Sequence, residues 1–272
     1  MSLLDIKELK VIDKQTKEEI VKGVRFSLKK NTCLGIVGES GSGKSMTTKA
    51  ILGLINQNLK TEGIAIFDGN IELLKASRED LRKIRGQRMC MILQDAMSAF
   101  DPLYTIGYQM IETLVENKRM SKSEAEKISI GALEKMLINE PKEVIKKYPH
   151  QLSGGMLQRC MIAIALSMSP DIIIADEPTT ALDSINQREV VEEFKRLREV
   201  TGTSLIFISH DLGVVQHLAD EILVMRKGEQ VEYGNAKDVF SNPKHEYTKY
   251  LVDTRLELTK SFSKSMSKEV AV

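Results

Sequence analysis

The sequence contains no tryptophan, and aromatic residues make up only 5% of its 272 positions. Such a chain offers few stacking platforms of the kind that single-stranded nucleic-acid binders use. An excess of charge of one sign is also missing, because 39 Lys and Arg against 38 Asp and Glu give a formal net charge of +1. No global electrostatic field therefore argues for a nucleic-acid partner, and we expect none.

Long hydrophobic runs and clustered cysteines are lacking as well. No stretch approaches the roughly 18 apolar residues that a membrane-spanning helix needs, and residues 1–10 lack the apolar core of a secretory signal. We therefore expect a cytosolic protein whose membrane role, if it has one, comes through a partner. Cys33, Cys90 and Cys160 are widely separated in apolar surroundings, which predicts buried, reduced thiols and argues against a disulfide or a zinc site.

What the sequence does contain is the pattern of an α/β core. Three short runs rich in Ile, Val and Leu, residues 33–37, 171–175 and 203–209, are followed by polar residues, as in strands buried on both faces of a parallel sheet. Residues 3–34 alternate apolar and polar side chains, which predicts antiparallel strands, and from about residue 95 to 151 the spacing becomes helical. We expect a parallel core, an N-terminal antiparallel β lobe and an inserted α-helical lobe.

The strongest functional signal is GESGSGKS at residues 38–45, which fits the phosphate-loop pattern G-x-x-x-x-G-K-[ST] between an apolar strand and a helical run, residues 46–55. Its glycines let backbone N–H groups form an anion nest, to which the helix N-terminus adds positive potential. Lys44 would reach the β- and γ-phosphates, and the Ser45 hydroxyl would ligate Mg²⁺. The residues expected to contact the nucleotide here are Gly38, Ser40, Gly41, Ser42, Gly43, Lys44, Ser45 and Met46.

A second signal is the acidic pair that ends IIIADE, residues 172–177. Neighbouring side chains on a strand point in different directions, so Asp176 can serve the Mg²⁺ shell while Glu177 orients or deprotonates the attacking water. An acidic pair alone would more often be a solvated loop. After three isoleucines and beside a phosphate loop, it predicts a phosphoryl-transfer site.

The segment LSGGMLQR, residues 152–159, narrows the class, because it resembles the signature sequence of ATP-binding cassette (ABC) proteins. Ser153 and the N–H groups of Gly154 and Gly155 stand ahead of an apolar helical run, residues 160–168, and so offer a second anion site. In the family, two cassettes pair head to tail, and the signature of one covers the ATP of the other. The resemblance also implies a nucleotide contact for Gln158.

Further positions resemble the family's other motifs. Gln94 is similar to the hinge glutamine that senses Mg²⁺, and His210 is similar to the switch histidine that contacts the γ-phosphate. Residues 181–183, ALD, resemble the loop that crosses the dimer interface, and this resemblance implies that Asp183 contacts the nucleotide. The resemblance thus implies Glu177 and His210 as catalytic residues, ATP and Mg²⁺ as cofactors, and a metal shell made of Ser45, Gln94 and Asp176.

The resemblance also implies a domain division. Residues 1–255 are expected to form one nucleotide-binding domain, in which 1–94 and 160–255 make the ATP-binding core with its β lobe and about 95–159 make the helical lobe. Residues 256–272 are expected to be a polar tail. One departure concerns the base: where the family often stacks adenine on an early aromatic ring, residues 11–14 read VIDK. We expect weaker binding of the base and poorer discrimination among nucleoside triphosphates.

Three segments, residues 94–103, 148–152 and 242–248, resemble the importer ATPases of the dipeptide, oligopeptide and nickel uptake group. Residues 98–100 and 156–159 are more similar to the nickel type, and the sequence ends without the cysteine-bearing extension of many peptide-type members. We therefore expect an ATPase that powers import of nickel or another transition metal, as a metal chelate. A dipeptide or oligopeptide importer is the alternative, and a soluble ABC switch protein without transport is a second.

The resemblance implies an assembly at the membrane. It consists of a second ATPase subunit, either a homologue or a second copy, two membrane-spanning permease subunits and an extracytoplasmic substrate-binding protein. The chain would then be a peripheral protein of the cytoplasmic face of the cell membrane. In this group the stretch after Gln94 faces the membrane partner, so residues 100–104 are expected to dock there, although they also fit a packed hydrophobic loop.

Overall fold

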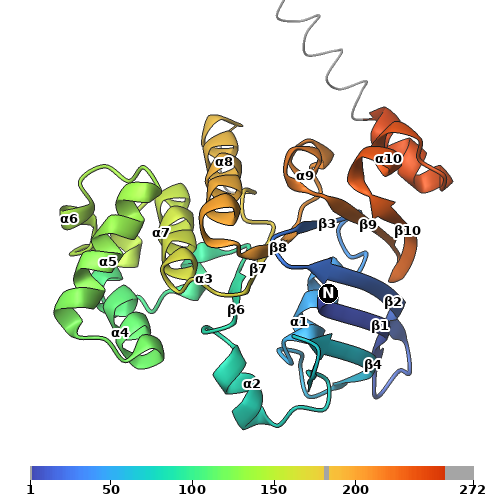
Figure 1. Cartoon of the computed structure of the whole chain (residues 1–272), viewed down its shortest axis with the longest axis horizontal. Helices are drawn as coiled ribbons and strands as arrows, with labels where there is room; N and C mark the ends of the chain where they lie inside the picture. Colours follow the sequence, from blue (N-terminus) through green and yellow to red (C-terminus); the bar gives the residue numbers. More distant parts are fainter. Residues whose placement is uncertain (1, 181–183, 255–272) are drawn as a thin grey trace, which may run out of the picture.

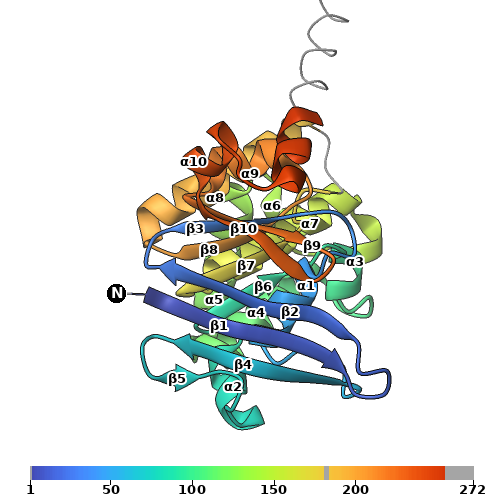
Figure 2. The same ribbon diagram turned by 90° about the vertical axis from the view of Figure 1, so that its right-hand side faces the viewer.

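The computed structural model describes residues 2–180 and 184–254, and its framework is a pair of sheets (Figure 1). The antiparallel sheet has the order β2 (Glu19–Lys29), β1 (Ser2–Asp13), β4 (Leu59–Phe67) and β5 (Ile71–Glu72). The second sheet has the order β10 (Glu229–Asn235), β9 (Glu221–Arg226), β3 (Cys33–Val37), β8 (Ser204–Ile208), β7 (Ile172–Asp176) and β6 (Met89–Ile92). Its neighbours are parallel except β9 and β10. Figure 2 shows the antiparallel strands on one side of this sheet.

The helices fall into three groups. Helix α1 (Lys44–Ile51) packs with β1 and β2 on the side of the antiparallel sheet, and α2 (Arg78–Ile84) precedes β6. Between β6 and β7 come α3 (Ala96–Ala99), α4 (Ile106–Lys118), α5 (Lys122–Lys135), α6 (Pro141–Val144), the 3₁₀ turn η1 (Pro149–Gln151) and α7 (Gly154–Ser167). After β7 come α8 (Ser184–Thr201), α9 (Leu212–Leu218) and α10 (Ala236–Ser241). Figure 1 shows α4, α5 and α6 grouped beyond the β6 edge.

The expected fold class is therefore confirmed, and alternation along the central strands explains how its layers are joined. On β7, Ile172 and Ile174 belong to a hydrophobic cluster with the antiparallel sheet and α1, whereas Ile173 and Ala175 belong to a cluster with α7 and α8. Successive strand side chains point to opposite faces, so a run that is apolar throughout serves two cores at once. β-Branched isoleucine also suits the pleated backbone of a central strand.

The inserted helices begin where local chemistry supports a helix start. Helix α5 has a capping box, in which the Ser121 hydroxyl accepts from the Glu124 N–H at 3.2 Å and the Glu124 carboxylate accepts from the Ser121 N–H at 3.4 Å. A side-chain cap of this kind contributes on the order of 1 kcal/mol. Pro141 and Pro149 stand at the first positions of α6 and η1, where a missing N–H costs nothing.

All three cysteines are free and buried, as expected, with exposures of 1% for Cys33, 7% for Cys90 and 0% for Cys160. Burial raises the pKa of Cys90 and of Cys160 to about 12 and raises that of Cys33 above its ordinary range. Across residues 2–180 and 184–254, no helix combines the length and apolar character needed to cross a bilayer.

Because the thiolate is the reactive form, we expect iodoacetamide at pH 8 to alkylate the native thiols at least about a hundredfold more slowly than those of the unfolded chain. Cys90 should react first, since it lines a cavity. Time-resolved mass spectrometry of the labelled peptides measures these alkylation rates, and labelling of the native chain at the rate of the unfolded chain would contradict the prediction.

The same thiols predict how stability depends on pH. In the unfolded chain the thiols ionise near pH 9, while Cys90 and Cys160 of the folded chain keep their protons to about pH 12. The free energy of unfolding should therefore fall as the pH rises across that window.

Candidate active site

The candidate site lies along one edge of the parallel sheet, where four neighbouring strands end. Strands β3, β8, β7 and β6 are adjacent and parallel, so their carboxyl ends meet at the same edge. The phosphate loop, residues 38–43, follows β3, and His210 comes two residues after β8. Asp176 ends β7, Glu177 follows it, and Gln94 comes shortly after β6. Open α/β sheets bind ligands at such an edge.

Two glycines give the phosphate loop its path into α1. Gly38 has a φ of 151°, and a side chain there would collide with the carbonyl oxygen of Met225. Gly43 has a φ of 98° and is the N-cap of α1. Because this left-handed turn leads directly into the helix, α1 begins at Lys44 and not at residue 46 as expected. The N–H groups of the first helical turn therefore belong to the phosphate loop and add an anion-binding helix terminus to it.

Lys44 lies in the mouth of this loop with only 5% of its surface exposed. Its ammonium group donates to the carbonyl oxygens of Gly38 at 2.8 Å and Glu39 at 2.9 Å. Burial lowers the pKa of Lys44, and the carboxylates of Glu177 and Asp176 oppose that shift. A partly desolvated cation held by carbonyl dipoles is well placed to attract a phosphate group.

Asp176 and Ser45 form a compact pair of oxygen ligands beneath the loop. The Ser45 hydroxyl donates to the Asp176 carboxylate at 2.7 Å, and Asp176 is only 4% exposed. Burial raises the pKa of Asp176, while the hydrogen bond from Ser45 works in the opposite direction. Carboxylate and hydroxyl oxygens are the donors that a hard cation such as Mg²⁺ prefers, so the residues fit the predicted metal.

Three side chains converge on one oxygen of Glu177. Its Oε2 atom lies 3.1 Å from Thr180 Oγ1, 3.2 Å from His210 Nδ1 and 3.4 Å from Gln94 Nε2. The backbone helps to aim the carboxylate, because Glu177 has a φ of 48° and its N–H donates to the carbonyl of Ile208 at 3.0 Å. The carboxylate that follows β7 is thus oriented by side chains that follow β8 and β6.

These groups surround a cleft of about 590 Å³. Its described lining consists of Ser40, Gly41, Gly43, Lys44, Ser45, Met46, Gln94, Glu177, Thr180 and His210. All of these except Thr180 were predicted from the sequence. Of the other predicted residues, Gly38, Ser42 and Asp176 are buried and do not line the cleft, and Asp183 lies outside the described residues.

Thr180 was missed because a hydroxyl in a polar turn is an ordinary feature of a sequence. The only local signal is its spacing three residues after Glu177, which lets its hydroxyl lie near both the backbone carbonyl of Glu177, at 3.2 Å, and its carboxylate. It holds the predicted catalytic carboxylate from within the same turn.

The signature residues lie apart from this cleft, at the start of α7. The Ser153 hydroxyl accepts from the Met156 N–H at 3.3 Å, and this cap makes α7 begin at Gly154 and not at residue 160 as expected. Ser153 and Gly154 are exposed, and a side chain built on Gly154 would meet no neighbouring atom. The structure therefore does not bring Ser153, Gly154 and Gly155 to the phosphate loop of the same chain.

Gln158 differs from its expected role as a nucleotide contact. Its side chain is 1% exposed, and its Nε2 donates to the backbone carbonyl of Leu93 at 3.3 Å. The physical reason is the helical period, since the buried residues Met161 and Ile162 follow three and four positions later on the same face of α7. Gln158 ties α7 to the residue that precedes Gln94.

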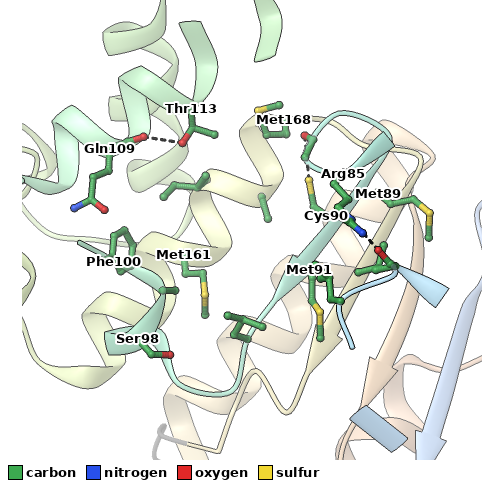
Figure 3. Close-up of a pocket in the computed structure, with 17 residues that line it drawn as sticks. Arg85, Met89, Cys90, Met91, Ser98, Phe100, Gln109, Thr113, Met161 and Met168 are labelled. Carbon is green, nitrogen blue, oxygen red and sulfur yellow. Dashed lines mark hydrogen bonds between the residues drawn. The ribbon is translucent and has the colours of Figure 1, made fainter. Parts of the chain in front are cut away.

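A second cleft, of about 520 Å³, lies between the core and the inserted helices (Figure 3). Leu52 and Met89 line it from the core, whereas Phe100 and Met161 come from the segment that contains α3 to α7. Residues 100–104 were expected either to dock on a membrane partner or to form a packed hydrophobic loop. Phe100 is buried and packs into the fold, whereas Leu103 is 78% exposed.

The end of β1 is where the sequence predicts a weak contact to the base. Val11 is fully buried, and the Asp13 carboxylate is engaged by the N–H groups of Gln15 at 2.8 Å and Thr16 at 2.9 Å. Among the described residues that line the nucleotide-sized cleft there is no Phe or Tyr.

Known proteins that are similar to this chain are ABC transporter proteins and ATP-binding cassettes. A family model described as ABC transporter matches residues 21–180. CntD, the ATP-binding protein of the metal-staphylopine import system of Staphylococcus aureus, is 44% identical over 270 residues, covering 99% of both chains. The dipeptide transport ATP-binding protein DppD of Bacillus subtilis is 46% identical over 244 residues, covering 88% of this chain and 72% of that protein. The dimeric post-hydrolysis structure of the cassette MJ0796 with ADP and Pi matches with a TM-score of 0.77 at 29% identity, covering 86% of this chain and 98% of that one.

Without an aromatic platform, the chain should bind nucleotides mainly through their phosphates. One stacked ring contributes on the order of 1 kcal/mol, so we expect the dissociation constants of MgATP and MgGTP to differ by less than about fivefold. Calorimetric titration of the full chain with both nucleotides measures the ratio. A preference for ATP of a hundredfold or more would contradict this account and would require a base contact elsewhere.

Proposed function

Because the chain belongs to the ABC transporter family, we propose that it is the ATP-hydrolysing subunit of an importer for transition metals carried as metal chelates. The observation that carries this proposal is the 44% identity with the metal-staphylopine import ATPase over 99% of both chains. The resemblance of residues 98–100 and 156–159 to the nickel type points the same way. The metal is cargo handled by the assembly, and ATP is the substrate of this chain.

A dipeptide importer is the second candidate, and a specific observation favours it. DppD of Bacillus subtilis is 46% identical to this chain, but the match covers only 72% of that protein. The match with the metal-staphylopine relative extends over 99% of both chains, and for this reason we place the metal-chelate importer first.

The phosphate loop supports binding of the nucleotide through its phosphates. Lys44 and the N–H groups at the start of α1 provide positive charge and donors in a partly desolvated cleft. Ser45 and Asp176 would hold Mg²⁺, and Gln94, which lines the same cleft, is the third residue expected in the metal shell. When bound, that ion neutralises charge on the β- and γ-phosphates.

Glu177 is the proposed catalytic carboxylate. In the hydrolytic step the oxygen of water forms a bond to the γ-phosphorus, the bond from that phosphorus to the bridging oxygen of ADP breaks, and the proton of the water passes to Glu177. The contacts from Thr180, His210 and Gln94 fix one carboxylate oxygen, which leaves the other to face the water. His210, 59% exposed on its side chain, can then reach the γ-phosphate side of the cleft.

A second cassette would complete the site. Ser153 and the exposed N-terminus of α7 offer an anion site that does not line the cleft of its own chain. In a head-to-tail pair this terminus would cover the γ-phosphate bound by the partner, and the partner's equivalent terminus would cover this one. ATP would close the pair, and hydrolysis would release it.

The cleft between core and inserted helices supports docking of a membrane permease subunit. It is lined mainly by apolar side chains, among them Phe100. In the same segment of the chain Leu103, Tyr104 and Met97 are exposed, with exposures of 78%, 45% and 49%. Exposed apolar groups around an apolar cleft mark interaction surfaces. A permease segment seated there would touch both the core and the inserted helices, so it would sense their relative movement. In the proposed assembly the chain lies on the cytoplasmic face of the membrane, and the substrate-binding protein lies on the other side.

Exchange of the proposed base is the direct test of the chemistry. Glu177→Gln keeps the size and hydrogen-bonding pattern of the side chain but cannot accept the proton, so turnover should fall at least about a hundredfold. MgATP binding should persist, and the variant should accumulate as a closed dimer with ATP, measured by phosphate release and by size-exclusion chromatography with light scattering.

Two further variants separate the roles. Lys44→Ala should weaken MgATP binding itself by at least about tenfold, because a charge-assisted contact to the phosphates is lost. Glu62→Gln, a change on the exposed surface of β4, should leave both quantities unchanged. Turnover by Glu177→Gln near the wild-type rate would remove Glu177 from the mechanism.

The cargo is tested with the assembly itself. The tagged chain would be recovered from its native membranes with its partners, reconstituted into vesicles, and supplied with labelled nickel, cobalt and zinc chelates or with labelled dipeptides. We expect ATP-dependent uptake of at least one metal chelate and none in an assembly that carries Glu177→Gln.

Two other outcomes of the transport experiment would favour a different function. Uptake of peptides alone would replace the metal-chelate proposal with the dipeptide importer. Recovery of the chain without any membrane subunit would favour a soluble ABC switch protein.

A further inference from the structure

Tyr247 connects the C-terminal part of the described chain to the phosphate loop. Its hydroxyl oxygen accepts a hydrogen bond from the backbone N–H of Glu39 at 3.0 Å, although the two residues are 208 positions apart. Tyr247 is 3% exposed and belongs to the core cluster of the helices that cover the parallel sheet. The guanidinium of Arg226 lies 4.8 Å from the centre of its ring. The phenol is therefore held in place by the surrounding core and directed at the loop.

The turn before Tyr247 is held by its own set of hydrogen bonds. The carboxylate of Glu232, on β10, accepts from the N–H groups of Lys244 at 2.9 Å and His245 at 3.1 Å. The ring of His245 in turn accepts from the N–H of Tyr247 at 3.1 Å, at the start of the helical segment formed by residues 246–254. Residues 242–248 resemble a segment of a group of importer ATPases, and the structure gives that segment a physical role, because it aims one tyrosine at the phosphate loop.

The contact acts on a peptide unit that Lys44 holds from its other side. The carbonyl of Gly38 accepts from the Lys44 ammonium at 2.8 Å, and the N–H of the same peptide unit, at Glu39, donates to Tyr247. Both polar groups of this peptide are therefore engaged, and it cannot rotate without breaking two hydrogen bonds. Gly38 has no side chain to restrict its backbone, so these two bonds supply the restraint.

We propose that Tyr247 is a positioning residue that holds the phosphate loop in its nucleotide-binding conformation through the N–H of Glu39. A loop ordered before the nucleotide arrives loses less conformational entropy on binding, so the contact increases affinity for nucleotide phosphates. Tyr247 does not line the cleft, and its hydrogen bond goes to the phosphate loop and not to Glu177 or His210. The contact should therefore affect binding and not the chemical step. This inference rests on ATP binding at the phosphate loop, as in the proposed function, but not on which cargo is imported.

Tyr233 provides a matched control from the same part of the chain. Its hydroxyl also accepts from a backbone N–H, that of Ser27 at 3.3 Å, and it donates to Glu221 at 2.6 Å. It lies on β10 and joins that strand to β2 and β9, and both of these hydrogen-bond partners lie outside the phosphate loop. Tyr233→Phe therefore removes an equivalent hydroxyl from the fold without touching the loop.

The test compares Tyr247→Phe with Tyr233→Phe in the full-length chain. Tyr247→Phe should raise the dissociation constants of both MgATP and ADP by about fivefold, the contribution of one hydrogen bond, whereas Tyr233→Phe should leave them unchanged. In the assembly recovered from membranes, KM for ATP should rise by a similar factor with kcat nearly constant. A purely structural tyrosine would lower the thermal midpoint in both variants and shift neither the dissociation constants nor KM selectively.

Amide hydrogen exchange gives an independent measurement. By reciprocity, a contact that strengthens nucleotide binding must itself be strengthened by nucleotide. ADP should therefore slow exchange in residues 246–254 of the wild-type chain, and this protection should be lost in Tyr247→Phe. If that variant does not fold, Glu232→Gln, which weakens the anchor of the turn, should raise the dissociation constants in the same direction.

The outcomes separate the two proposals. If Tyr247→Phe bound MgATP as tightly as wild type does, and ADP as tightly as wild type does, the role of Tyr247 would be overturned while the proposed ATPase function would stand. A wild-type chain that binds no nucleotide would overturn the proposed function and this inference together. A fivefold loss confined to Tyr247→Phe would support the positioning role whatever the transport assay finds.

Discussion

The parallel pairing of β3, β8, β7 and β6 is the constraint on which the candidate site depends. The segment after each strand contributes residues to the cleft just past the strand's carboxyl end, and these residues are neighbours in space because the strands are neighbours in the sheet. The pairing is held by residues such as Ile173 and Ile174, which lie in separate cores on the two faces of the sheet. Loss of packing on either face would therefore displace the carboxylates at the end of β7.

Helix α7 connects this edge to the inserted helices. Gln158 donates to the carbonyl of Leu93, beside Gln94, and the next residue, Arg159, reaches the carbonyl of Met136 at 3.4 Å and the carboxylate of Glu189 on α8 at 3.1 Å. One helix is thus bonded to the end of α5, to the segment after β6 and to α8. A displacement of the inserted helices would have to be shared by α7, and through it by the segment that carries Gln94.

The sequence was sufficient for the central strands β3, β7 and β8, for the phosphate loop and for the position of the acidic pair after β7, because these features are local. Runs such as residues 172–177 combine burial, β-branching and terminal polar groups within a few positions. The orientation of Gln158 could not be predicted, because it depends on where α7 begins, and that start is set by the Ser153 cap. Tyr247 was equally hidden, since its partner is a backbone N–H 208 positions earlier. Contacts of this kind depend on tertiary structure and produce no periodic pattern in the sequence.

The insertion between β6 and β7 has a consequence for the evolution of such chains. These two strands pair directly although the whole group from α3 to α7 separates them along the chain. The entropic cost of closing a loop grows only with the logarithm of its length, so doubling the inserted segment would cost about 0.6 kcal/mol. Natural selection can thus lengthen, shorten or resurface this segment to suit different membrane partners at little thermodynamic cost. The candidate site at the sheet edge lacks such freedom, because one residue added between Asp176 and Glu177 would redirect the predicted catalytic carboxylate.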